Sequence, residues 1–108
     1  MRSFPWVHGI KKAYGPKGLK VVGIHTPEFD FEKKRSQVVK IVKKYQLDHP
    51  IMMDNDYRYW KALGAKYWPS FFLVDQKGQV VLNSVGEMHE GEKSADRFEK
   101  VIKKLLSL

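Results

Sequence analysis

The chain has 108 residues, 43% of them hydrophobic, which is enough for one domain with a single modest core. It contains no cysteine, which excludes thiolate nucleophiles, disulfide bonds and cysteine-based zinc or iron–sulfur sites within this polypeptide. The net charge of +8 suggests an anionic partner, but the lysines are spread over every predicted helix and no zinc-finger spacing or RNA-binding motif accompanies them. We therefore expect a solvated basic surface and no nucleic-acid partner.

Neither a membrane span nor a secretion signal is visible in the sequence. No apolar run approaches the ~20 residues that a transmembrane helix needs. The first six residues also lack the apolar segment of a signal peptide. We predict a single domain over residues 1–108 with no membrane segment of its own.

The first half of the chain predicts a helix, a strand and a second helix. Ser3 is suited to cap a helix that tolerates Pro5 in its first turn and ends at the glycine-rich residues 15–18. A β-branched run bounded by turn residues predicts a strand over residues 19–25. Apolar residues at three-to-four-residue spacing predict an amphipathic helix over residues 30–45, long enough to cross over a sheet.

A short apolar stretch and a further helix follow. Residues 50–53 are apolar, and residues 54–56 (Asp-Asn-Asp) offer N-caps to a helix that closes near Gly64. The three aspartate and asparagine residues also resemble the start of a calcium-binding loop. That motif requires glycine and glutamate at positions occupied here by Tyr59 and Ala65, so we favour the helix caps and predict no metal site.

The last third of the chain predicts a hairpin and a final helix. Residues 70–74 and 79–85 are two strands joined by a turn with glycine at its last position, so they should pair antiparallel. A helix beginning near Gly91 buries an apolar stripe that includes Phe98 and Ile102. Strands joined by crossover helices require parallel pairing. The expected class is therefore α/β, with a mixed sheet flanked by helices.

The stretch Tyr67-Trp68-Pro69-Ser70 directly precedes a predicted strand. Proline cannot donate to a sheet ladder, so Pro69 belongs at the start of that strand, and an aromatic residue before it favours the cis isomer. The four residues alone leave two interpretations open: a plain proline at the start of a strand, or the corner of a binding surface. We expect Trp68 to be partly exposed and Trp60 to lie in the core.

His25, at the end of its strand, is the histidine best placed to be a general base or a metal ligand. The other three histidines are scattered, and no two of the four stand at ligand spacing. We therefore favour a hydrogen-bonded structural role for His25, with a place in a substrate groove as the alternative.

Three separated motifs, in order, resemble the redoxin-like, thioredoxin-fold domains of the TlpA and DipZ type. They are residues 23–29 (Gly-Ile-His-Thr-Pro-Glu-Phe), residues 53–56 (Met-Asp-Asn-Asp), and residues 67–70 (Tyr-Trp-Pro-Ser) followed by 73–75 (Leu-Val-Asp). Members of these families are extracytoplasmic thiol-disulfide oxidoreductases. The resemblance implies an extracytoplasmic location, a protein thiol or disulfide as substrate and no cofactor.

The resemblance also implies a substrate-binding site. Pro69 resembles the family's cis-proline, and its loop, with Tyr67, Trp68 and Ser70, would pair its backbone with an extended substrate segment. His25, Pro5 and Trp6 are further candidates to line the groove.

The catalytic half of that site is missing. Pro5 resembles the proline that follows the family's Trp-Cys-x-x-Cys motif, which places the second cysteine immediately before Met1. We expect a chain shortened just after the motif, with no catalytic residue and no redox activity by itself. The alternative is a cysteine-free binding or scaffold module that uses the Trp68-Pro69 surface without catalysis.

The resemblance further implies that one strand is missing from the sheet. In the family, the strand before the first helix lies between the strands that resemble residues 19–25 and 70–74. We expect either that these two strands close up into an altered sheet, or that a second copy fills the place by strand swapping to form a homodimer.

Overall fold

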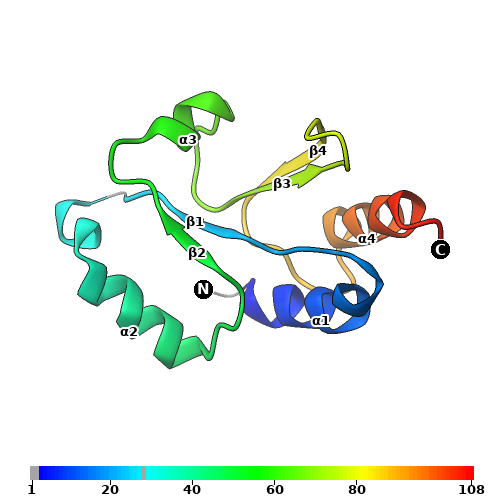
Figure 1. Cartoon of the computed structure of the whole chain (residues 1–108), viewed down its shortest axis with the longest axis horizontal. Helices are drawn as coiled ribbons and strands as arrows, with labels where there is room; N and C mark the ends of the chain where they lie inside the picture. Colours follow the sequence, from blue (N-terminus) through cyan, green and yellow to red (C-terminus); the bar gives the residue numbers. More distant parts are fainter. Residues whose placement is uncertain (1–2, 28) are drawn as a thin grey trace. The chain divides into compact units, whose positions relative to one another are not determined.

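The structure, a computed structural model, describes residues 3–27 and 29–108 (Figure 1). The chain divides into two compact units. One unit is discontinuous and contains Met1–Lys20 and Tyr67–Leu108, while the other contains Val21–Lys66. The α/β class is confirmed, since helices and strands alternate along the chain.

The discontinuous unit contains two long helices and a hairpin. Its elements are α1 (Phe4–Tyr14), β3 (Ser70–Val74), β4 (Val80–Val85) and α4 (Lys93–Leu105) (Figure 1). A short 3₁₀ turn, Gly15–Lys17, ends α1, as the glycine and proline residues there predict. All four elements lie within two residues of their predicted positions.

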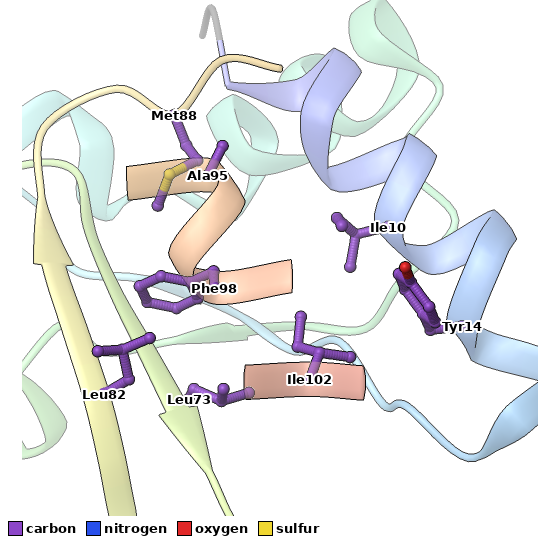
Figure 2. Packing of buried hydrophobic residues seen from close by; sticks show 8 residues of the cluster. All are labelled: Ile10, Tyr14, Leu73, Leu82, Met88, Ala95, Phe98 and Ile102. Atoms are coloured by element: carbon purple, nitrogen blue, oxygen red, sulfur yellow. The ribbon is translucent and has the colours of Figure 1, made fainter. Parts of the chain in front are cut away.

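The core of this unit is formed where α1 and α4 meet the hairpin. Figure 2 shows side chains from the three elements directed toward one another. The apolar stripe of α4 is the one predicted from its spacing. The buried residues are Ile10, Tyr14, Leu73, Leu82, Met88, Ala95, Phe98 and Ile102.

Ser3 joins the start of α1 to the segment between β4 and α4. Its position before the helix is the predicted one, but its side chain forms no cap hydrogen bond. The hydroxyl instead donates to the Glu87 carboxylate and accepts from the Met88 N–H at 2.6 Å. Because Ser3 is buried, these bonds satisfy a polar group that would otherwise be costly to enclose.

The hairpin turn depends on Asp75. Its Oδ1 accepts from the backbone N–H groups of Lys77 and Gln79, both at 2.9 Å. The Gly78 N–H donates to the Asp75 carbonyl oxygen at 3.1 Å, and Gly78 has a φ of 84°, which favours glycine. The predicted turn is therefore confirmed.

The second unit consists of residues Val21–Lys66. Its elements are β1 (Gly23–His25), a 3₁₀ turn (Asp30–Lys33), α2 (Arg35–Tyr45), β2 (Ile51–Met53) and α3 (Arg58–Ala62) (Figure 1). β1 and β2 pair in parallel, Gly23 opposite Ile51 and His25 opposite Met53.

Two predicted elements of this unit are shorter in the structure. The strand predicted over residues 19–25 keeps only its last three residues, because β2 offers only three partners. The helix predicted over residues 30–45 is interrupted at Lys34, whose extended backbone (φ −76°, ψ 128°) separates the 3₁₀ turn from α2.

The strands form two separate two-stranded sheets, one parallel (β1 with β2) and one antiparallel (β3 with β4). Both kinds of pairing were predicted, but in one mixed sheet. The expectation that the strands predicted over residues 19–25 and 70–74 close up on each other stays a prediction. The family strand that would separate them has no counterpart among these elements, so each strand keeps only its other neighbour. Strand swapping stays a prediction.

Candidate functional site

The loop at residues 67–70 presents two aromatic side chains to solvent. Tyr67 is 64% exposed and Trp68 is 41% exposed, as predicted for Trp68. The Trp68-Pro69 peptide bond is cis, also as predicted. Large exposed aromatic side chains on an ordered loop are typical of binding surfaces, because they offer much apolar contact area at little entropic cost.

Hydrogen bonds fix both sides of this loop. The Ser70 hydroxyl donates to the Tyr67 carbonyl oxygen at 2.6 Å, and the Gly86 N–H donates to the Pro69 carbonyl oxygen at 2.9 Å. Because Pro69 has no N–H, it cannot donate a second hydrogen bond to Gly86, and the ladder between β3 and β4 ends at this residue. Gly86 has a φ of 97°, a backbone conformation that other residues rarely adopt. The sheet therefore stops where the exposed aromatic rings begin.

Trp6 supports the strand that follows the loop. Its ring packs edge-on against the rings of Phe71 in β3 and Phe98 in α4, with distances between ring centroids of 5.8 Å and 6.1 Å. Trp6 therefore packs against the core. The sequence suggested a core position for Trp60 instead, but Trp60 is half-buried and does not belong to this core cluster. Trp6 shares the helical apolar face of Ile10, and that spacing is the signal that identifies it.

Pro5 and Trp6 also line a hollow of about 220 Å³ between α1 and residues 90–99. Three carboxylates line it as well, those of Glu90, Asp96 and Glu99. No residue of the 67–70 loop belongs to this hollow. A role for Pro5 and Trp6 in a shared substrate groove therefore stays a prediction. The acidic lining was not predicted, because the three carboxylates are spread over residues 90–99 and each looks like an ordinary solvated position of a loop or helix.

Glu99 is tied to the core through Tyr14. The Tyr14 hydroxyl donates to Glu99 Oε1 at 2.6 Å. This hydrogen bond raises the pKa of Tyr14, and burial and the negative charge of Glu99 act in the same direction.

His25 is the last residue of β1 and is half-buried. Its Nε2 lies 2.8 Å from the Glu32 carbonyl oxygen, to which it donates. This hydrogen bond fits the structural role that the sequence favoured for His25. A place for His25 in a substrate groove stays a prediction.

Asp54 is a buried carboxylate, 1% exposed, at the start of α3. It accepts the Thr26 hydroxyl at 2.8 Å and the backbone N–H groups of Tyr59 and Trp60 at 3.1 and 3.0 Å. Burial alone raises the pKa of Asp54, but these hydrogen bonds to its charged form outweigh burial and hold the pKa below its usual value. The residue directly before α3 is Tyr57 and not one of the predicted caps, but Asp54 still binds N–H groups of the first turn of the helix, as a cap would.

The described side chains offer binding contacts and little reactive chemistry. With no cysteine, the chain has no thiolate. Nowhere in residues 3–27 and 29–108 do three or more His, Asp or Glu side chains gather in a way that suits a metal ion. None of the helices within these ranges is long and apolar enough to cross a bilayer.

Comparison with known proteins agrees with this geometry. Protein DipZ of Mycobacterium tuberculosis is 40% identical over 86 residues, which are 80% of this chain and 12% of that protein. Thiol-disulfide oxidoreductase ResA of Bacillus cereus is 25% identical over 104 residues, 96% of this chain and 54% of ResA. The chain thus spans about an eighth of DipZ and about half of ResA.

A solved structure gives the same fold. The crystal structure of a putative thiol:disulfide interchange protein DsbE from Chlorobium tepidum superposes with a TM-score of 0.81 and 25% identity, over 96% of this chain and 68% of the other. The fold is therefore thioredoxin-like. The Redoxin family matches residues 1–102. The chain therefore belongs to the Redoxin family, as a member in which no cysteine is present.

Proposed function

We propose that the chain is the substrate-binding part of a Redoxin-type thiol-disulfide oxidoreductase domain, and that the 108-residue polypeptide binds extended protein segments without exchanging thiols. The observation that carries the proposal is the exposed Tyr67-Trp68 pair on a loop held by Ser70 and Gly86, in a chain without cysteine. Exposed backbone groups beside such a loop can form hydrogen bonds with an extended peptide, and this pairing requires no sulfur atom.

The resemblance supports two further parts of the proposal. The TlpA- and DipZ-type domains that the chain resembles act on protein thiols or disulfides, and ResA carries the name thiol-disulfide oxidoreductase. Those domains are extracytoplasmic, and we propose the same location for this domain.

A second candidate function is a non-catalytic binding module. The zero cysteine count favours it. Reading the codons upstream of Met1 in frame separates the two proposals. A Trp-Cys-x-x-Cys motif there supports the oxidoreductase, whereas an in-frame stop codon contradicts it and supports the binding module.

Binding at the loop is tested with carboxymethylated insulin B chain, an extended polypeptide with blocked thiols. Titrating it into the ¹⁵N-labelled chain should shift the Trp68 indole and the amides of Tyr67 and Ser70. Trp68→Ala should weaken binding more than about fivefold, as for an aromatic hot spot. Tyr59→Ala is the matched control, since Tyr59 is a similarly exposed aromatic residue outside the loop, and should change the affinity less than twofold. Equal effects of the two substitutions would contradict the site.

Redox activity is tested separately. An insulin-reduction assay with dithiothreitol should give the same rate with and without the 108-residue chain, because a mixed disulfide requires a thiolate. Turnover above the dithiothreitol background, retained after repurification, would overturn the proposed absence of thiol chemistry.

A further inference from the structure

One side of α4 carries a single row of cations. The row follows the helix at spacings of four, three and four residues, which keeps its members within about 60° of arc on an α-helix. All the side chains of this row are exposed, and the row extends over about 16 Å at ~1.5 Å per residue. The residues of the row are Lys93, Arg97, Lys100 and Lys104.

The opposite side of α4 is held in the core of its own unit. Phe98 and Ile102 are 4% and 3% exposed and point into the core cluster with α1 and the hairpin (Figure 2). Ile102 lies about 160° around the helix from both Lys100 and Lys104. The row therefore faces away from this core, and its position follows from contacts within one compact unit.

The negative charges of α4 lie to one side of the row and leave it uncompensated. Asp96 and Glu99 line the hollow beside α1, and Glu99 accepts the Tyr14 hydroxyl. No salt bridge within residues 3–27 and 29–108 includes a cation of the row. Like charges three or four residues apart on a helix repel one another and lower its stability. An anionic partner would offset this repulsion.

The composition of this side of α4 selects the kind of partner. About 100° of its circumference holds only the four cations. Protein–protein interfaces are depleted in lysine and depend on aromatic or apolar anchors, which this arc lacks. Nucleic-acid modules add aromatic rings or amide side chains that contact the bases, and these are absent from the arc too.

An anionic bilayer needs none of these groups. Its headgroups form a continuous charged plane, and four or more neighbouring lysine and arginine residues are enough to bind it. We propose that α4 docks the domain on bilayers that contain anionic phospholipids, through Lys93, Arg97, Lys100 and Lys104. The row shares no residue with the 67–70 loop, so membrane docking and peptide binding stand or fall independently.

Docking of this kind is purely electrostatic, because the apolar side of α4 is buried in the core and does not insert into the bilayer. Each cation near an anionic surface strengthens binding about fivefold, so four cations should give half-maximal binding at about 1 mM lipid. Salt screens the attraction, and binding should fall at least about tenfold between roughly 50 mM and 500 mM sodium chloride.

Co-sedimentation of the whole 108-residue chain with vesicles tests the proposal. Vesicles of phosphatidylcholine with about 30% phosphatidylglycerol should bind the chain at least about tenfold more strongly than vesicles of phosphatidylcholine alone. No binding to the anionic vesicles, or equal binding to both kinds, overturns the proposal. Binding of a short DNA duplex in the absence of vesicle binding would indicate a nucleic-acid partner and overturn it as well.

Matched charge reversals separate the row from the net charge of +8. Arg97→Glu with Lys100→Glu should weaken binding to the anionic vesicles about twentyfold or more, because two attractive charges become repulsive. Lys40→Glu with Lys43→Glu, at exposed positions of α2, changes the net charge equally and should weaken binding less than about threefold. Equal weakening by the two pairs overturns the assignment to α4.

Circular dichroism establishes that each variant is folded before its binding is compared. If the reversal on α4 unfolds the chain, Arg97→Gln with Lys100→Gln is compared with Lys40→Gln with Lys43→Gln in the same assay. Neutralisation on α4 should weaken binding about tenfold or more, and on α2 less than about twofold. Arg97→Lys keeps the charge and should keep the binding, and a loss with this variant would contradict an electrostatic contact.

Discussion

Replacing Asp54 with alanine is expected to lower the free energy of unfolding by about 3 kcal/mol or more, because it leaves three donors without their acceptor. The donors are the Thr26 hydroxyl and the backbone N–H groups of Tyr59 and Trp60, and the carboxylate that binds them is buried. Urea denaturation followed by circular dichroism measures the loss. Asp56→Asn is the control, since Asp56 is exposed and its loss should change stability by less than about 0.5 kcal/mol.

Acid stability gives an independent check on Asp54. Its pKa is lower in the folded chain than in the unfolded chain, so ionisation stabilises the fold above the unfolded value. That contribution is complete at neutral pH and is lost as the pH falls below about 4 toward the folded pKa. Asp54→Asn should lack this part of the acid-induced loss. An identical pH dependence in the two proteins would contradict the role of the buried carboxylate.

Replacing Phe98 with alanine is expected to lower the free energy of unfolding by about 3–5 kcal/mol. Phe98 is 4% exposed, and its removal opens a cavity beside Trp6, whose ring it contacts edge-on. Because Trp6 also contacts Phe71, the amides of Phe71 and Ser70 should shift in the folded variant. Urea denaturation and a ¹⁵N spectrum measure the two effects. Lys100→Ala, at an exposed position of the same helix, should leave both nearly unchanged, and a loss below about 1 kcal/mol for Phe98→Ala would contradict the packing.

Sequence patterns predicted the parts of the fold that local chemistry decides. The apolar stripe containing Phe98 and Ile102 predicted the buried face of α4. Pro5 and the glycine-rich residues 15–18 predicted where α1 begins and ends. The turn at Asp75 and Gly78 followed from residue types suited to it. In each case the determining contacts lie within a few residues of one another.

Features that depend on distant partners were not predictable in this way. The strand predicted over residues 19–25 is limited to three residues by the length of β2, which no local pattern in that strand reveals. The left-handed backbone of Tyr57 (φ 62°), which precedes α3, has no signal in its residue type. At the candidate site, Pro69 and Trp68 were identified from residue type. The acidic hollow was not, because Glu90 and Pro5 meet only through the packing of α1 near α4.

Ser3 donates to the Glu87 carboxylate and accepts from the Met88 N–H, and this long-range link has a consequence for synthesis of the chain. The apolar face of α1, with Ile10 and Tyr14, leaves the ribosome long before its partners on α4. At ~5–20 residues per second, Met88 follows Tyr14 by roughly 4–15 s, during which this face has no native partner. The nascent first helix is therefore a stretch where a chaperone would bind, and the unit closes only after α4 has been translated.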